Sequence, residues 1–284
     1  MIAFVFNYGL TLADVSEPLV PKDYVAIKPV KVALNGIENA IYNGQIWARP
    51  GTILGGIGIA KVIEGGVDSE WSSLAGRLVV VSPYSRAYGG LGSEINGIAA
   101  ERAAVPKDAI FPYFSELGDL NVLLPFASIA VKAAEEAEGR RMLIVGYGVL
   151  GKLVALASKD KANVGIYTED RRVDLGISVA DANPSEWDVV FVSALNTWPR
   201  VFFSGVRKLL MPRFMKSWPV IEREKLKFIE PEFVDEAVAL LKSNAERLKD
   251  VIVYSDSFSS AIPVPKGKIV LVDAEKALRI TTSP

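Results

Sequence analysis

A short apolar run that opens into three closely spaced glycines is the feature that most constrains how this chain can fold. The segment Arg141 to Lys152 reads Arg-Met-Leu-Ile-Val-Gly-Tyr-Gly-Val-Leu-Gly-Lys. In this pattern Gly146 would turn the chain sharply out of a strand, Gly148 would let an anion approach the main chain, and Gly151 would let the next helix pack closely. Because the N-terminus of a helix attracts anions, the pattern predicts a βαβ unit that binds the pyrophosphate of a dinucleotide. The alternative is a glycine turn with a purely structural role.

The chain contains no cysteine and no histidine among its 284 residues. It therefore has no disulfide, no thiolate or imidazole metal ligand, no cysteine nucleophile and no Ser-His-Asp triad. A zinc site made of carboxylates alone is disfavoured, because zinc prefers nitrogen and sulfur ligands. The remaining chemistry belongs to carboxylates, lysine, tyrosine, hydroxyl groups and a bound organic cofactor.

Length and charge narrow the class of protein further. A chain of 284 residues with 50% hydrophobic content can bury a large core and commonly divides into two domains. The net charge is -1, the sequence pI is about 5.8, and basic and aromatic residues do not interleave, so nucleic acid and membrane surfaces are not expected partners. The N-terminal residues lack the basic segment of a signal peptide, and we expect no apolar run to be long enough to span a bilayer. We therefore expect a cytoplasmic protein.

The pattern of apolar residues changes along the chain. Before about residue 110 it favours short strands separated by glycine and proline, and Ser115 to Ala137 has helical periodicity. From residue 140 strands and helices alternate, which predicts a parallel sheet, and Pro231 to Leu248 follows as a helix. Residues 196–231 stay unassigned because three prolines interrupt them. The expected strands are Tyr24 to Val32, Thr52 to Ile63, Arg77 to Val81, Met142 to Val145, Val164 to Thr168, Val189 to Ser193, Asp250 to Tyr254 and Lys268 to Val272.

This order of segments, together with the glycine motif, resembles the medium-chain dehydrogenase/reductase superfamily. Five further segments are similar to family segments: Lys31 to Gly44, Pro50 to Glu64, Gly76 to Pro83, Gly97 to Pro106 and Pro263 to Leu271. The resemblance implies an α/β fold with two domains. A GroES-like, β-rich catalytic domain would comprise residues 1–128 and 251–284, and a Rossmann dinucleotide-binding domain with a doubly wound parallel sheet would comprise residues 129–250.

The chain departs from the zinc-dependent members of that superfamily where they bind the metal. Glu38 stands at the position of their first cysteine, Gly56 at their metal-ligand histidine, Ile57 at its acidic neighbour and Ser128 near their third ligand. Ala40 falls near the hydroxyl that relays protons in alcohol dehydrogenases. The resemblance therefore implies the zinc-independent, quinone oxidoreductase-like branch, in a shortened form, with no metal site.

In that branch NAD(P)H gives a hydride to a quinone, an enone or another carbonyl-type acceptor. Two alternatives stay open: a catalytically degenerate relative with a nucleotide-binding, structural or partner-binding role, and an S-adenosylmethionine-type Rossmann enzyme. We expect a small-molecule substrate and a homodimer. The candidate catalytic residues, each with a purely structural alternative, are Tyr42, Glu38 and Lys132, and the amides of Asn35, Asn39 and Asn43 could bind substrate or form turns.

Cofactor choice should depend on the end of the second nucleotide-domain strand. If Glu169 or Asp170 meets the ribose, its carboxylate selects NAD. If Thr168 stands there, Arg171 and Arg172 can bind a 2′-phosphate, which favours NADP. Family spacing favours NADP narrowly. The predicted cofactor-binding residues are Gly146, Gly148, Val149, Leu150, Gly151, Thr168, Glu169, Arg171, Arg172 and Ser193.

Overall fold

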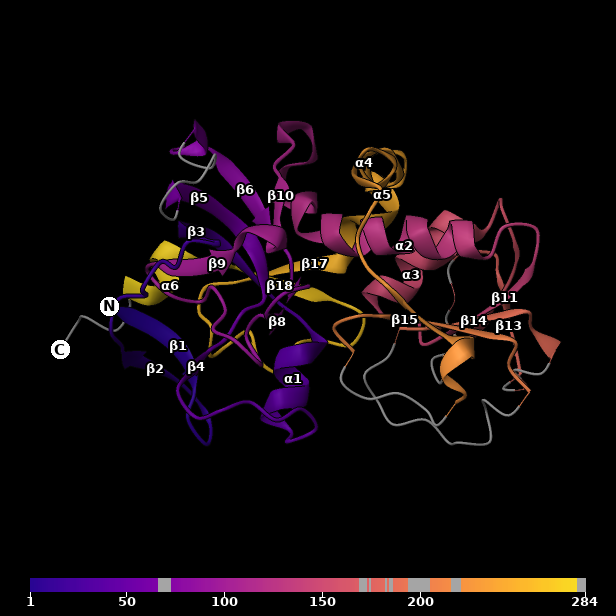
Figure 1. Cartoon of the computed structure of the whole chain (residues 1–284), viewed down its shortest axis with the longest axis horizontal. Helices are drawn as coiled ribbons and strands as arrows, with labels where there is room; N and C mark the ends of the chain where they lie inside the picture. The colour runs from indigo at the N-terminus through magenta and orange to yellow at the C-terminus, as the bar shows by residue number, and fades with distance from the viewer. Residues whose placement is uncertain are drawn as a thin grey trace. The chain divides into compact units, whose positions relative to one another are not determined.

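The computed structural model describes residues 1–65, 73–168, 173, 175–181, 183, 186–193, 205–215 and 221–279 (Figure 1). The chain divides into two compact units, which we call unit 1 and unit 2. Unit 1 comprises Met1–Val122 and Asp250–Pro284, and unit 2 comprises Leu123–Lys249. The expected α/β fold with two domains is confirmed. The expected first boundary, residue 128, lies inside the helix Leu124–Glu136, and this helix belongs wholly to unit 2.

Unit 1 consists mainly of β-strands around an apolar core. Strands β1, β2 and β4 form one sheet in the order β2-β1-β4, and a larger sheet has the order β10-β6-β5-β3-β18-β17, with β9 also paired to β3. The larger sheet buries the apolar residues of β3 and β5, among them Ile27, Val32 and Ile57. The bounds are β1 Ile2–Phe6, β2 Leu10–Asp14, β3 Tyr24–Leu34, β4 Thr52–Ile53, β5 Ile57–Gly65, β6 Leu78–Val81, β7 Tyr84–Ser85, β8 Gly89–Gly90, β9 Ala103–Pro106, β10 Ile110–Pro112, β17 Ile252–Ser255 and β18 Ile269–Asp273.

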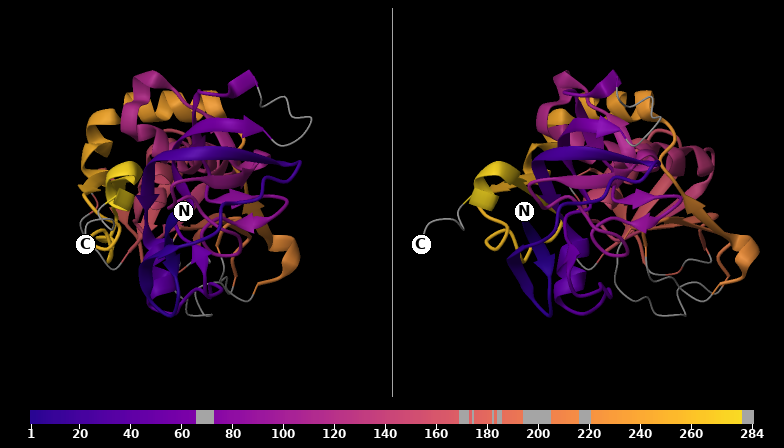
Figure 2. Two further views of the ribbon diagram at one scale, coloured as in Figure 1. Left: turned by 90° about the vertical axis from the view of Figure 1, so that its left-hand side faces the viewer. Right: turned by 60° about the vertical axis from the view of Figure 1, so that its left-hand side comes forward.

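The end of the chain completes the sheet that its beginning starts. Strand β18 pairs antiparallel with β3, so that Val272 lies opposite Val32. Helix α6 (Ala274–Arg279) then contacts β1 and β3, and Figures 1 and 2 show it in yellow beside the indigo N-terminal strands. The other helices of this unit are α1 (Gly36–Tyr42) and the 3-10 helices Lys107–Ala109 and Ser115–Leu123, and a 3-10 helix Lys249–Val251 stands at the boundary between the units.

Unit 2 contains a six-stranded parallel sheet with the order β13-β12-β11-β14-β15-β16. Its strands are β11 Arg141–Val145, β12 Asn163–Tyr167, β13 Ser178–Val179, β14 Val189–Val192, β15 Lys208–Pro212 and β16 Leu226–Ile229. Its helices are α2 Leu124–Glu136, α3 Val149–Ser158, α4 Val234–Ser243 and α5 Ala245–Leu248, with a 3-10 helix Arg223–Lys225. The strand order reverses between β11 and β14, and ligands of doubly wound sheets bind outside the carboxyl ends of the strands at this point.

Residues 196–231 were left unassigned from the sequence, and the structure has two strands there, β15 and β16. β15 and β16 continue the parallel sheet on the side of β14. Pro212 is the last residue of β15, where the missing N–H of proline interrupts little of the ladder. The parallel sheet therefore continues through this part of the chain.

One helical stretch of the described chain, Ser115–Glu136, is long and apolar enough by composition to cross a membrane, which the sequence analysis did not expect. Its most apolar window is 78% buried inside the protein. Gly118 also has non-helical dihedral angles within the stretch, so it is two helices rather than one continuous helix. Burial of this kind is found in core helices of globular domains.

Candidate functional site

The glycine turn follows β11 and leads directly into helix α3. Gly146 has a φ of 96°, and its N–H donates to the carbonyl oxygen of Tyr167 at 2.8 Å, which fixes the turn against the neighbouring strand. Gly151 lies so close to the turn that a Cβ atom would be 2.2 Å from the Gly146 carbonyl oxygen. Glycine is therefore required at both positions by the backbone itself.

Gly148 differs from the other two glycines because packing does not require it. It is the N-cap residue of α3 with an ordinary extended conformation, φ -79° and ψ -169°. A Cβ atom at this position would meet no heavy atom of the described residues within 4 Å. Because the N-cap residue Gly148 has no side chain, it makes no capping hydrogen bond to the first backbone N–H groups of α3, which include those of Val149 and Leu150. This combination of open space and helix N-terminus fits an anion such as a pyrophosphate.

Ser193 connects the turn to strand β14 across the point where the strand order reverses. Its hydroxyl lies 2.8 Å from the Gly146 carbonyl oxygen and 3.1 Å from that of Val145, and can donate to either. Ser193 therefore supports the turn from the neighbouring strand. Thr168 follows β12 and is half-buried, whereas the predicted residues Glu169, Arg171 and Arg172 lie outside the described residues.

Glu38 is buried, with an exposed fraction of only 2%, so it is not a solvated carboxylate. It forms a capping box with Asn35 at the start of α1, and the Asn35 N–H donates to Glu38 Oε2 at 2.7 Å. The backbone N–H groups of Asn35, Glu38, Gly56 and Gly55 all favour the ionised carboxylate and so lower its pKa. Burial raises the pKa of Glu38 from 4.5 to about 7, although these hydrogen bonds lower it.

The donor groups around Glu38 and Ser128 differ from those that zinc prefers. A Cβ atom at Gly56 would lie 2.6 Å from the carbonyl oxygen of Leu91, so no side chain fits there without a shift of the backbone. In unit 2, Ser128 Oγ accepts the N–H of Glu232 at 2.8 Å. The described residues contain no cluster of three or more acidic, cysteine or histidine side chains, and the whole sequence has neither of the two soft ligands. This donor set does not fit zinc.

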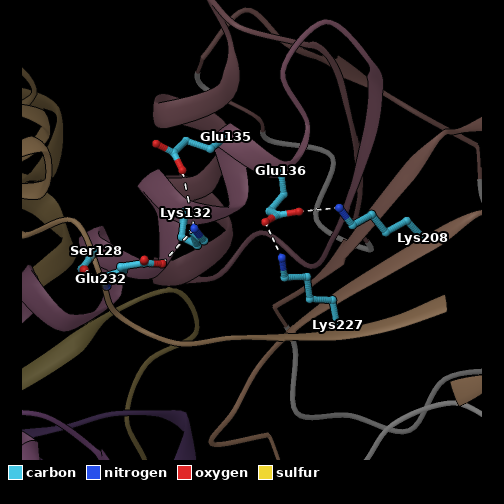
Figure 3. Close-up of polar contacts among 7 residues, drawn as sticks. All are labelled: Ser128, Lys132, Glu135, Glu136, Lys208, Lys227 and Glu232. Atoms are coloured by element: carbon cyan, nitrogen blue, oxygen red, sulfur yellow. Dashed lines mark hydrogen bonds and ion pairs between the residues drawn. The ribbon is translucent and has the colours of Figure 1, made fainter. Parts of the chain in front are cut away.

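Lys132 belongs to a polar network inside unit 2 (Figure 3). Its ammonium group lies 2.8 Å from Glu232 and 3.7 Å from Glu135, and 4.8 Å from the centre of the Phe233 ring. The hydrogen bond to Glu232 is the main cause that raises the pKa of Lys132 above its usual value. These contacts connect helix α2 to the chain that precedes α4.

Glu136, on the same helix, binds two lysines of the parallel sheet (Figure 3). Its carboxylate forms ion pairs with Lys208 on β15 and, at 2.6 Å, with Lys227 on β16. Burial alone would raise the pKa of Glu136, but the hydrogen bonds and charges of the two lysines together lower it to about 2. This arrangement attaches α2 to the edge of the sheet.

Tyr42 is the exposed member of the three candidate catalytic residues. It is the last residue of α1, and 58% of its surface is exposed. The neighbouring amide of Asn39 is not available to a substrate, because it pairs with both backbone groups of Val264 at 2.8 Å. The burial of Glu38 at the start of α1 was not predicted from the sequence, although the spacing of Asn35 and Glu38 is that of a capping box.

No family model and no curated protein sequence matches the chain. Among solved structures, 2R,3R-butanediol dehydrogenase from Bacillus subtilis is similar with a TM-score of 0.67 and 18% identity, over 96% of this chain and 99% of that chain. The chain has the fold of a two-domain dehydrogenase.

Two further solved structures have the same fold. Glucose dehydrogenase from Haloferax mediterranei, in complex with NADP, Zn and gluconolactone, has a TM-score of 0.71 and 14% identity, over 96% of this chain and 99% of that chain. Acetophenone reductase from Geotrichum candidum, in complex with NAD, has a TM-score of 0.69 and 14% identity, over 96% of both chains. At these identities the similarity concerns the fold, and the chemistry has to be argued from the residues of this chain.

Proposed function

We propose that the protein is an NAD(P)H-dependent oxidoreductase that works without zinc. The observation that carries this proposal is the open, uncapped start of helix α3 at Gly148, beside the point where the order of the parallel strands reverses. The backbone from Gly146 to Gly151 would hold the pyrophosphate, and the bound cofactor would supply a hydride. The structures of similar fold that contain NADP or NAD support the same assignment.

The proposed acceptor is a quinone, an enone or another carbonyl-type small molecule. Oxidation of an unactivated alcohol is helped by a Lewis acid that lowers the pKa of the hydroxyl group. Glu38 is buried and a side chain at Gly56 would meet the backbone of Leu91, so the described residues at these positions offer no suitable ligands for such a metal. An acceptor that is already electrophilic requires mainly positioning against the cofactor. We further propose a homodimer as the working form.

The test begins with cofactor binding. Gly148→Val places a side chain where the pyrophosphate would approach, and we expect binding of NADPH and NADH to be lost while the fold is retained. The matched control is Gly9→Val, because Gly9 is a second glycine with open space around its Cβ position and lies in the hairpin of unit 1. Fluorescence titration and thermal denaturation of both variants separate binding from folding. Unchanged affinity in folded Gly148→Val protein would show that the turn is only structural.

Preference for NADP rests on Arg171 and Arg172. Two guanidinium groups beside a 2′-phosphate make charge-assisted hydrogen bonds worth roughly 1.5–3 kcal/mol each, so replacing both with alanine should weaken NADPH binding more than about tenfold. NADH binding should change little. Equal losses for the two cofactors would contradict phosphate recognition by these arginines.

Turnover is then measured as NADPH oxidation with a panel of quinones, enones and aldehydes. Turnover with any of these acceptors supports the oxidoreductase. Tight cofactor binding without turnover on the whole panel would favour the second candidate, a relative of the dehydrogenases that keeps the nucleotide site for binding or assembly. This candidate is favoured by the engagement of Lys132 in an ion pair and by the small number of exposed candidate catalytic groups among the described residues.

A further inference from the structure

A groove of about 330 Å³ lies on unit 1, and all of its lining residues belong to that unit. Strand β4 and the chain beside it contribute to the lining. The Ile53 N–H donates to Asn96 Oδ1 at 3.1 Å, and the Gly97 N–H donates to the Ile53 carbonyl oxygen at 2.7 Å. A groove of this volume is at the lower end of the range for small-molecule sites.

A tight turn brings two polar side chains of the groove together. Residues 49–52 form a β-turn that is closed by a hydrogen bond from the Thr52 N–H to the Arg49 carbonyl oxygen at 3.0 Å. Pro50 at its second position and Gly51 at its third, with a φ of 86°, are typical of a type II turn. The Cα atoms of the first and fourth residues of such a turn are less than about 7 Å apart. The side chains of Arg49 and Thr52 therefore begin at neighbouring points of the groove.

Thr52 has a buried hydroxyl group that the protein does not use. The residue lines the groove and is only 3% exposed, and its hydroxyl makes no hydrogen bond within the described part of the chain. The described polar atoms that are sealed from solvent without a partner are Asn35 Nδ2 and Ser158 Oγ, so the Thr52 hydroxyl remains accessible from the groove. Asn96 is similar, since its Oδ1 accepts the Ile53 N–H and its Nδ2 has no described partner. Buried polar groups normally have partners, and a ligand in the groove would supply them.

Arg49 supplies a positive charge that no described residue neutralises. Its exposed side chain makes neither a hydrogen bond nor an ion pair within the ranges that the structure describes. Two other charged side chains of the groove are engaged: Arg102 pairs with Glu17 at 3.3 Å, and Glu94 Oε2 accepts the Gly90 N–H at 2.6 Å. A guanidinium group presents two parallel N–H donors that match a carboxylate. The groove is therefore suited to an anion with a single charge.

The groove also has an apolar wall, which includes Pro18, Leu19 and Pro21. The Leu19 side chain is 90% exposed, although leucine is one of the residues that proteins most often bury. An apolar group in the groove would remove part of this surface from water, which is favourable. The ligand that fits therefore has an apolar part beside its charge.

We propose that this groove binds a small monocarboxylate with an apolar substituent. The carboxylate accepts the paired N–H groups of Arg49 and hydrogen bonds from the Thr52 hydroxyl and the Asn96 amide, and the apolar part covers Leu19. A phosphate dianion is a poorer match, because the groove offers its second charge no further unpaired cation among the described residues and Glu94 repels it. The glycine turn belongs to unit 2, so this site does not depend on the proposed function.

The experiment is a titration of the whole chain with phenylacetate, followed by NMR through the amide resonances of Ile53 and Gly97. We expect both resonances to shift and to saturate together. Acetate has the charge without the apolar part, and 2-phenylethanol has the apolar part without the charge. Each of them, and inorganic phosphate as well, should bind at least about tenfold more weakly than phenylacetate, because each lacks one half of the match.

Two variants test the residues that carry the proposal. Arg49→Ala should weaken phenylacetate binding at least about tenfold, because it removes charge-assisted hydrogen bonds. The matched control is Arg77→Ala, which removes another exposed arginine of unit 1 that lies outside the groove and should change the affinity less than about twofold. Thr52→Val should weaken binding about two- to tenfold and leave the Tm unchanged, since the hydroxyl has no described protein partner to lose.

Several results would overturn the site. Phenylacetate that causes no saturable shift, 2-phenylethanol that binds as tightly, or inorganic phosphate that binds more tightly would each contradict it. Unchanged affinity in folded Arg49→Ala would do the same, and unchanged affinity in Thr52→Val would remove the hydroxyl from the site. The comparison of ligands needs no variant, so it decides the question even if Arg49→Ala does not fold.

Discussion

The protein should lose stability as the pH rises from 4.5 to about 7, and Glu38 is the cause. In the unfolded chain its pKa is near 4.5, and in the folded protein burial raises it to about 7. Between these values the folded state holds a proton that the unfolded state has released, so rising pH favours unfolding. A shift of this size corresponds to roughly 3 kcal/mol, since each pKa unit is worth about 1.4 kcal/mol.

The range from pH 4.5 to 7 is well suited to measuring the effect of Glu38 on stability. The sequence has no histidine, the residue that normally titrates there. The pKa of Glu136 is lowered to about 2, below the range, and the pKa of the Met1 amino group is raised above 8.0 by its hydrogen bond to Asp14. Among the described residues, Glu38 is therefore the carboxyl group whose pKa is raised into this range, and the Glu38→Gln variant isolates its contribution.

The assay is urea unfolding followed by tryptophan fluorescence at several pH values from 5 to 8, for the unaltered protein and for Glu38→Gln. We expect the free energy of unfolding of the unaltered protein to fall by about 2.5 kcal/mol between pH 5 and 8, most of it below pH 7, and then to become constant. The glutamine side chain does not titrate, so the variant should show a nearly level profile. A level or rising profile in the unaltered protein would refute the assignment of a raised pKa to Glu38.

Three further predictions concern the glycine turn, the ion pairs of Glu136 on α2 and the binding of zinc. Gly151→Ala should lower the unfolding free energy by about 1–3 kcal/mol, because its Cβ would lie 2.2 Å from the Gly146 carbonyl oxygen, and a variant with unchanged thermal denaturation would contradict this packing. Glu136→Gln should cost about 1–2 kcal/mol at pH 7, and the unaltered protein should lose the same contribution as the pH falls from 4.5 towards 2, as measured by denaturation across that range. Chelators should leave the Tm unchanged and elemental analysis should find no stoichiometric zinc; one tightly bound zinc per chain is the opposing result.

The sequence was informative where structure is determined locally. The alternation of strand and helix from residue 140 predicted the parallel sheet, which the structure confirms, because buried parallel strands read as short apolar runs. Residues 196–231 gave no such pattern, since prolines interrupt it. β15 and β16 belong to the sheet through pairing with β14 and with each other, and sequence periodicity contains no information on that pairing.

The same distinction applies to the candidate site. The shape of the glycine turn could be predicted because it depends on three residues within six positions of one another. The surroundings of Glu38 and Lys132 could not, because tertiary packing buries Glu38 and Glu232 comes to Lys132 from a distant part of the chain. A residue pattern indicates which side chains are present, and tertiary structure decides whether a carboxylate is solvated, paired or buried.

Glu38 and Glu136 show that tertiary surroundings can shift the pKa of a glutamate in either direction. Both carboxyl groups lie in helices, and in each of them burial by itself acts to raise the pKa. Glu136 meets two lysine ammonium groups, which outweigh burial and keep it ionised down to about pH 2, so the attachment of α2 to its sheet does not change near neutral pH. Glu38 meets only backbone N–H groups among its described neighbours, and these do not outweigh burial. In a chain without histidine, Glu38 at the start of α1 is therefore the described carboxyl group whose raised pKa lies near 7, and the ion pairs that attach α2 to the sheet of unit 2 should not change there.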